Sequence, residues 1–214
     1  MATAPPDPRP GAAHRVLLAA LLCAAFAFVG AGAFLAFELR QGPRSAARSW
    51  LGGAVGGRFD LVDQNGNRVS SIDLNGAWLL VYFGYTHCPD ACPAALNNIA
   101  LTLRALGAAR RAAIRPVFIT IDPARDTPRV MKDYVASFDA PILALTGTAA
   151  QVARAAKAYR VYYAPRTEPG GDYSLDHTSL IYLIDPNGRF AGSLDGAAAP
   201  APLVERLKQL IGED

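Results

Sequence analysis

Cysteine, histidine and net charge are all scarce in this sequence. Its 214 residues contain three cysteines and three histidines, and the formal net charge is +3. Three cysteines are too few for the disulfide framework that stabilises small secreted domains. The charge imbalance comes from one end, because residues 1–49 carry five Lys/Arg against two Asp/Glu, whereas residues 50–214 carry sixteen of each. A neutral main body gives no electrostatic support for nucleic-acid binding.

One segment lacks charge altogether. Residues 16–37 read VLLAALLCAAFAFVGAGAFLAF, a uniformly apolar run with no charged side chain. A helix over this run is about 33 Å long, enough to cross a bilayer. We therefore expect a transmembrane anchor over residues 16–39, behind a short tail over residues 1–15. A cleaved signal peptide is the rival interpretation, because residues 31–33 read AGA, although the apolar run continues past them.

Either interpretation exports the rest of the chain. Arginines flank the apolar run on both sides, so the positive-inside rule does not orient it by itself. We expect a single-pass protein whose main domain lies on the non-cytoplasmic side, in a bacterial inner membrane facing the periplasm, with the mitochondrial inner membrane as the alternative. Residues 40–56 are rich in glycine, serine and arginine and read as a linker. The domain is then expected over residues 57–214.

Residues 57–214 alternate between strand-like and helix-like segments. Continuous apolar runs at 77–85 and 114–122 predict central strands that are buried on both faces. This alternation predicts an α/β fold with helices on both faces of the sheet. The other predicted segments are helices at 93–107, 128–138, 148–161 and 202–213, a strand at 141–147, and hairpins around Asn65–Gly66 and over 177–194.

Cys88 and Cys92 follow the first central strand, at the start of the next helix. Sites in α/β sheets are usually built beyond the carboxyl ends of strands. The amides and dipole of a helix start favour thiolate at both sulfurs. Four residues make about one helical turn, which places the two Cα atoms roughly 6 Å apart, within the range of a disulfide. A disulfide, a reactive thiol, a metal site and plain packing all remain open on these grounds.

The histidines limit which metal could bind here. His87 adjoins Cys88, so its ring is expected to point away, and this leaves Cys88, Cys92 and His177 as possible ligands. Structural zinc needs about four protein ligands and iron–sulfur clusters usually four cysteines. Copper tolerates fewer ligands, and thiolates select Cu(I). The pattern alone does not bring His177 to the cysteines, and a strand-end histidine is the simpler interpretation. Asp176 is the expected partner of its ring.

Neighbouring residues allow less specific predictions. Asp90 reads as an ordinary turn carboxylate, with tuning of the thiols as the alternative. Two interpretations are equally good for the loop that contains Asp122, Arg125 and Asp126. These residues form either an ion pair beside the site or a solvated turn that caps the next helix. We expect Tyr82, Phe83 and Tyr85 to lie in the core. We expect Tyr159, Tyr162 and Tyr163 to lie on an exposed loop.

Four motifs together resemble the Sco/SenC family, and they occur in the same order as in that family. The resemblance covers residues 57–212, and a CxxxC followed far downstream by Asp-His is its specific part. It implies a membrane-tethered, thioredoxin-like α/β domain with a mixed central sheet. Ala91 departs from the family, which has a larger apolar residue there, and we expect this to alter only loop packing. The motifs are VYFGYTHCPDACP, VFITIDPARDTP, YRVYYAP and DHTSLIYLIDPNGRF.

The resemblance also implies a function. It places Cys88, Cys92 and His177 on the family's three ligands for copper, as Cu(I) and/or Cu(II). The implied protein is a metallochaperone rather than an enzyme. It receives copper from an upstream donor and delivers it to the binuclear copper site of cytochrome c oxidase subunit II.

Three other functions are compatible with these residues. The main alternative is a thiol–disulfide oxidoreductase that keeps the acceptor cysteines reduced, in which Cys88 and Cys92 are the catalytic pair and His177 is dispensable. A peroxidase of the peroxiredoxin type fits less well, because Thr86 is one position too close to Cys88. A copper or redox sensor on the same fold is the third.

Overall fold

A mixed seven-stranded sheet forms the centre of the computed structural model, which describes residues 55–211. The strand order is β2-β1-β5-β4-β3-β8-β9. β3, β4 and β5 run parallel, and the other neighbours are antiparallel. The strands are β1 Asp60–Asp63, β2 Arg68–Ser70, β3 Trp78–Gly84, β4 Ile114–Thr120, β5 Leu143–Thr146, β8 Leu180–Ile184 and β9 Phe190–Asp195.

β3 and β4 are the two central strands that the apolar runs predict. Every residue of β3 after Trp78 is buried, and so is every residue of β4 except Arg115. Both strands are covered on two faces, which explains why their sequences are continuously apolar rather than alternating. β3 ends at Gly84, and the chain then turns into the helix that carries Cys92.

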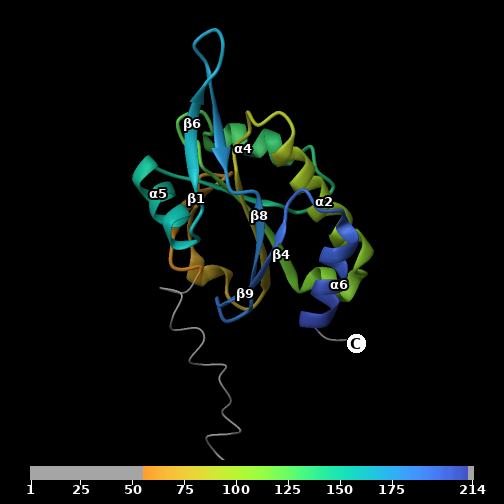
Figure 1. Cartoon of the computed structure of the whole chain (residues 1–214). Helices are drawn as coiled ribbons and strands as arrows, with labels where there is room; N and C mark the ends of the chain where they lie inside the picture. The colour runs from red at the N-terminus through yellow and green to blue at the C-terminus, as the bar shows by residue number, and fades with distance from the viewer. Residues whose placement is uncertain (1–54, 212–214) are drawn as a thin grey trace, which may run out of the picture. The chain divides into compact units, whose positions relative to one another are not determined.

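The helices cover both faces of this sheet, as predicted. α2 and α6 pack on each other, whereas α4 contacts β5 and α5 contacts β1. Figure 1 shows α2 and α6 together on one side and α5 on the other. α2 begins two residues earlier than predicted, and Gly107, with φ of 78°, separates it from a further short helix. The helices are η1 Ser71–Leu74, α2 Ala91–Ala105, α3 Ala108–Ala112, α4 Pro128–Val135, α5 Ala149–Ala158 and α6 Pro200–Ile211.

A second, two-stranded sheet was not predicted. β6 Tyr163–Thr167 pairs with β7 Tyr173–His177 in an antiparallel hairpin that belongs to no other sheet. In Figure 1 this hairpin projects beyond the main sheet. His177 is therefore the last residue of β7, and the predicted hairpin over 177–194 starts instead at Leu180.

The expectation of an exposed tyrosine loop holds for Tyr162 and is wrong for Tyr159 and Tyr163. Tyr159 is 3% exposed and packs against Phe83 and Tyr182, because it closes α5 over the sheet. Tyr162 is 66% exposed, as expected, and Tyr163 is half-buried in β6. Tyr82, Phe83 and Tyr85 lie in the core, which confirms their prediction.

The expected tail, anchor and nearly all of the linker fall within residues 1–54, outside the described residues. Within residues 55–211, no helix combines the length and the apolar character that crossing a membrane requires. The anchor over residues 16–39 stays a prediction.

Candidate metal centre

The structure brings Cys88, Cys92 and His177 together. One potential ligand atom from each, two sulfurs and a ring nitrogen, all lie within 4.8 Å of one another. The Cys92 sulfur is 3.5 Å from His177 Nε2, and the Cys92 amide donates to the Cys88 sulfur at 3.4 Å. His177 is a strand-end residue bonded to its neighbour Thr178, as the simpler interpretation expects, and its ring also lies beside both sulfurs.

The start of α2 positions the two sulfurs. Cys88 lies half-buried in the loop after β3, and Cys92 is fully buried in the first turn of α2. The fit of Cys92 depends on Gly84, because a Cβ atom at position 84 would stand 2.6 Å from the Cys92 sulfur. The end of a buried strand and the start of the next helix thus approach closely enough to place both thiols at one point.

The backbone carbonyl of Thr178 holds the His177 ring. Nδ1 lies 2.9 Å from that oxygen. A carbonyl oxygen only accepts, so Nδ1 donates to it, and Nε2 is the ring nitrogen that faces the sulfurs. The prediction that Asp176 orients the ring is wrong, because Asp176 is exposed and its carboxylate lies 3.8 Å from Arg166 instead.

Two tyrosine rings enclose the imidazole. Tyr82 and Tyr85 meet the His177 ring edge to face, with centroids 6.2 and 6.0 Å away. The Tyr82 hydroxyl lies 3.1 Å from the hydroxyl of Ser179. The sequence predicts both tyrosines in the core but does not predict their ring contacts with His177. The available signal was their position in the motif that carries the cysteines, but that position does not reveal where His177 lies.

The two thiols differ in acidity. The thiol of Cys92 donates a hydrogen bond to Cys88, and this lowers the pKa of Cys88 to about 4. The same bond, together with burial, raises the pKa of Cys92. The prediction that both sulfurs favour thiolate is therefore wrong for Cys92. Its hydrogen bond to Cys88 and its burial raise its pKa by more than the helix start lowers it. Cys88 is thus the more acidic of the two cysteines.

The loop between β3 and α2 is tied to the end of β4. Asp126 is fully buried and accepts hydrogen bonds from the hydroxyls of Thr86 and Thr120, both at 2.6 Å. Its prediction as part of a solvated turn is wrong. Thr86 thus donates to Asp126 and not to Cys88. His87 is exposed and outside the ligand group, as predicted.

Asp122, in the loop that follows β4, is 4% exposed and forms an ion pair with Arg125. The ion pair that the sequence allowed is therefore present. Asp90, the N-cap residue of α2, makes no capping bond through its side chain, and it is exposed.

An open cavity of about 330 Å³ leads to the candidate site. One wall is the loop of Cys88, and the other is the β6–β7 hairpin. Its charged lining residues carry one positive and three negative groups, so a positively charged ion is favoured there. These residues are Arg166, Asp90, Glu168 and Asp176.

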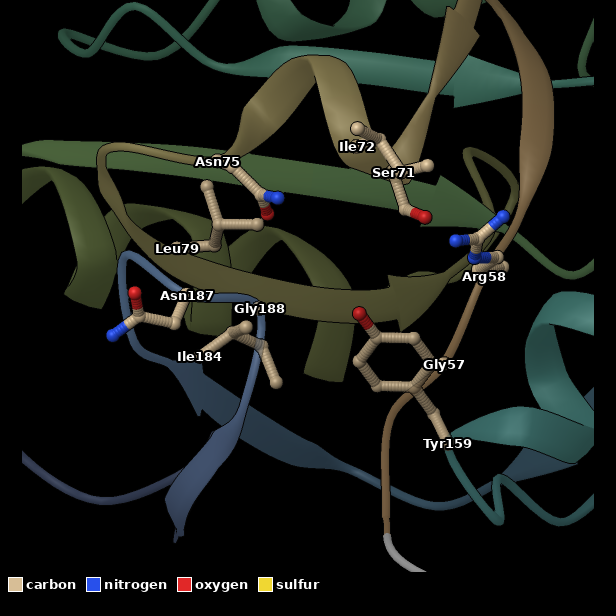
Figure 2. Close-up of a pocket in the computed structure, with 10 residues that line it drawn as sticks. All are labelled: Gly57, Arg58, Ser71, Ile72, Asn75, Leu79, Tyr159, Ile184, Asn187 and Gly188. Atoms are coloured by element: carbon tan, nitrogen blue, oxygen red, sulfur yellow. The ribbon is translucent and has the colours of Figure 1, made fainter.

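A separate cavity of about 240 Å³ lies at the opposite end of β3 (Figure 2). Leu79 and Ile184, which pair across β3 and β8, form its floor, and Arg58 stands at its edge. The hydroxyl of Tyr159 points toward it, and burial raises the pKa of that hydroxyl to about 12. This cavity has no thiol or imidazole in its lining, so it is no candidate for the metal centre.

Comparisons with known proteins agree with this geometry. Residues 49–212 match the sequence profile of the family described as SCO1/SenC. Protein SCO1 of Saccharomyces cerevisiae mitochondria is 39% identical over 177 residues, which are 80% of this chain and 60% of the yeast protein. The mitochondrial SCO2 homologue of Bos taurus is 38% identical over 94% of this chain and 76% of its own length. The chain thus spans somewhat less than two thirds of the yeast relative.

Two solved structures of relatives contain copper. The ScoI of Bradyrhizobium japonicum with copper bound is 44% identical, with a TM-score of 0.67 over 73% of this chain and 99% of that chain. Yeast Sco1 with copper bound is 39% identical, with a TM-score of 0.68 over 74% of this chain and 88% of that chain. These neighbours confirm the thioredoxin-like α/β fold with its mixed central sheet. On the profile match and these identities, the chain belongs to the SCO1/SenC family.

Proposed function

We propose that this chain is a copper metallochaperone for the assembly of cytochrome c oxidase. Copper is its cargo, held by Cys88, Cys92 and His177. The proposed acceptor is the binuclear copper site of oxidase subunit II, and an upstream protein donates the metal. The proposed anchor over residues 16–39 tethers the domain on the non-cytoplasmic side of the membrane.

The convergence of two sulfurs and one imidazole nitrogen is the observation that carries this proposal. Their ligand atoms span no more than 4.8 Å, so small side-chain movements suffice for all three to reach one ion. Thiolates suit Cu(I) and imidazole suits both oxidation states, whereas a closed zinc site needs a fourth ligand. The open cavity beside Cys88 gives a partner access to the ion, which a transfer protein needs and a structural metal site does not.

The test is anaerobic Cu(I) binding by the reduced full-length chain, in competition with a chromophoric chelator. We expect one tight equivalent, weakened in each of Cys88→Ser, Cys92→Ser and His177→Ala. His87→Ala is the matched control, because its ring is exposed and lies outside the ligand group. Copper binding that is no tighter in wild type than in the double cysteine variant contradicts the proposal.

A second function is favoured by the unequal thiols. A thiolate at Cys88 beside a thiol at Cys92 is the arrangement of a nucleophile and a resolving cysteine. Cys88 is also the more accessible sulfur, as a nucleophile must be. We propose that the same pair can reduce the disulfide of an acceptor, which oxidises Cys88 and Cys92 to a disulfide and transfers two electrons.

His177 discriminates between the two functions. Replacing His177 by Ala removes a copper ligand but leaves both sulfurs, so reductase activity on a peptide disulfide is expected to persist while copper affinity falls. If His177→Ala abolishes both, disulfide reduction is not an independent activity of this pair.

A further inference from the structure

The strand that carries His177 is not part of the main sheet. β7 pairs with β6 alone, and a two-stranded hairpin is only marginally stable in water. Its orientation over Cys88 and Cys92 therefore depends on side-chain contacts with the main domain.

Arg125 holds the outer half of β7. Its Nη1 donates to the carbonyl oxygen of Tyr173 at 3.0 Å and to the Asp172 carboxylate at 3.2 Å. Its guanidinium also lies over the Tyr173 ring, 3.8 Å from the centroid. The Arg125 side chain is 18% exposed but the Asp172 side chain is 75% exposed, so solvent screens the pair with Asp172, and the contacts with Tyr173 are the ones protected from it.

Asp122 completes the attachment. It forms the ion pair with Arg125 and accepts a hydrogen bond from the Tyr173 hydroxyl at 2.9 Å. Asp122 and Arg125 belong to the loop that follows β4, so these contacts join that loop to β7. We call Asp122, Arg125 and Tyr173 the hairpin clamp.

A further contact lies between the clamp and His177. The Tyr85 hydroxyl accepts a hydrogen bond from the amide of Leu175 at 3.1 Å. The Tyr85 ring is 5.8 Å from the Arg125 guanidinium carbon on one side, and 6.0 Å from the His177 ring on the other. One aromatic ring thus connects Arg125 to the imidazole.

We propose that Arg125, through the hairpin clamp, is a positioning residue for His177. The inference rests on the proposed copper-binding function. Arg125 touches no candidate ligand, and Tyr173 precedes His177 by four residues, about 13 Å along an extended strand. The clamp fixes the tilt of the hairpin, and this keeps Nε2 within reach of the two sulfurs. Without the clamp, β7 and the Tyr85 ring that packs on His177 lose their fixed orientation, and the copper is left with the two cysteines.

The test counts ligands to bound copper by X-ray absorption on the full-length chain loaded with one equivalent of Cu(I). We expect two sulfurs and one imidazole nitrogen in wild type, and loss of the nitrogen in Arg125→Met, as in His177→Ala. The copper affinity of Arg125→Met is expected to fall about tenfold, the range for loss of an outer contact that orients a ligand. Arg104→Met is the matched control, since Arg104 pairs with Asp139 on the surface and should behave as wild type.

A double variant separates positioning from general destabilisation. If Arg125 acts through His177, then Arg125→Met causes no further loss of affinity in the His177→Ala background. An equal loss in both backgrounds, or a nitrogen ligand retained in Arg125→Met, overturns the inference. A wild type that binds no copper overturns the proposed function and this inference together, whereas a normal wild type beside an unchanged Arg125→Met overturns the inference alone.

Tyr173→Phe provides a milder variant if Arg125→Met does not fold. It keeps the ring under the guanidinium and removes only the bond to Asp122, so a smaller loss in the same direction is expected. Hydrogen exchange of the metal-free chain gives a readout without copper. The Leu175 amide should exchange faster in both clamp variants and not in Arg104→Met, and unchanged exchange in both contradicts the clamp.

Discussion

A side chain at position 84 would collide with the sulfur of Cys92. The nearest atoms to a Cβ there also include the rings of Tyr82 and Phe118, at 3.1 Å each, so neither side offers space. We expect Gly84→Ala to lower the free energy of unfolding by about 1–3 kcal/mol through overpacking, and to weaken Cu(I) binding because Cys92 must move. Urea denaturation and chelator competition measure the two effects.

Gly147→Ala is the control for this substitution. A Cβ at position 147 also meets atoms at 3.1 Å, but these are the ends of the Gln151 and Leu61 side chains, away from the thiols. Its copper affinity should match wild type. A Gly84→Ala chain that binds copper as tightly as Gly147→Ala would show that the sulfur does not depend on this close approach.

The unequal acidity of the thiols predicts a pH dependence. Because the pKa of Cys88 is lowered to about 4, its thiolate persists down to mildly acidic pH, where an ordinary thiol is protonated. The rate of alkylation of the metal-free chain by iodoacetamide should therefore change little between pH 8 and about pH 5, and fall below that. Mass spectrometry should place the label on Cys88.

Cys92→Ala tests the cause of that shift. The hydrogen bond from Cys92 is the largest contribution to the lowered pKa, and alanine has no donor to replace it. We expect the midpoint of Cys88 alkylation to move to higher pH in Cys92→Ala. A midpoint near that of a free thiol in wild type would contradict the assignment of the thiolate to Cys88.

At the scale of elements, Asp126 connects the loop after β3 with the end of β4. Both oxygens of its buried carboxylate accept from threonine hydroxyls, and Thr86 also donates through its amide at 3.1 Å. Asp126→Asn leaves at least one of these donors without an acceptor, so we expect a loss of about 1–3 kcal/mol in the free energy of unfolding. Thermal unfolding followed by circular dichroism measures it.

Asp139→Asn is the surface counterpart. Asp139 is exposed and forms a surface ion pair with Arg104, so replacing it should change the free energy of unfolding by no more than about 0.5 kcal/mol. Equal effects of the two substitutions would mean that Asp126 does not carry the connection between these elements.

The elements differ in how well the sequence predicts them. β3 and β4 follow from apolar runs, because strands buried on both faces leave little other choice of residue. The β6–β7 hairpin cannot be predicted from an apolar run, because its residues are half-buried or exposed. Its register depends on partners outside it, such as Arg125 and Tyr85. The cysteine pair was a visible candidate, whereas the place of His177 came only from the family resemblance, since no local pattern reports a contact across the fold.

At the scale of the whole molecule, the membrane anchor is the prediction with the largest consequence. A chain with a helix over residues 16–39 should stay in the membrane fraction after an alkaline carbonate wash, because the apolar run is long enough to span the bilayer. Cys88 should react with a membrane-impermeant maleimide added from the non-cytoplasmic side. A chain released by carbonate, or labelled only after the membrane is opened, contradicts the proposed topology.

The candidate ligands Cys92 and His177 are 85 residues apart in the chain. An ion that binds both closes a loop of that length, as a cross-link does, and in the chain-entropy treatment such closure restricts the unfolded state by about 4–5 kcal/mol. Three-ligand binding is then possible only when strand, helix and hairpin have all assembled. Copper binding by all three ligands therefore selects fully folded chains. A partly folded or damaged chain offers the metal two cysteines at most.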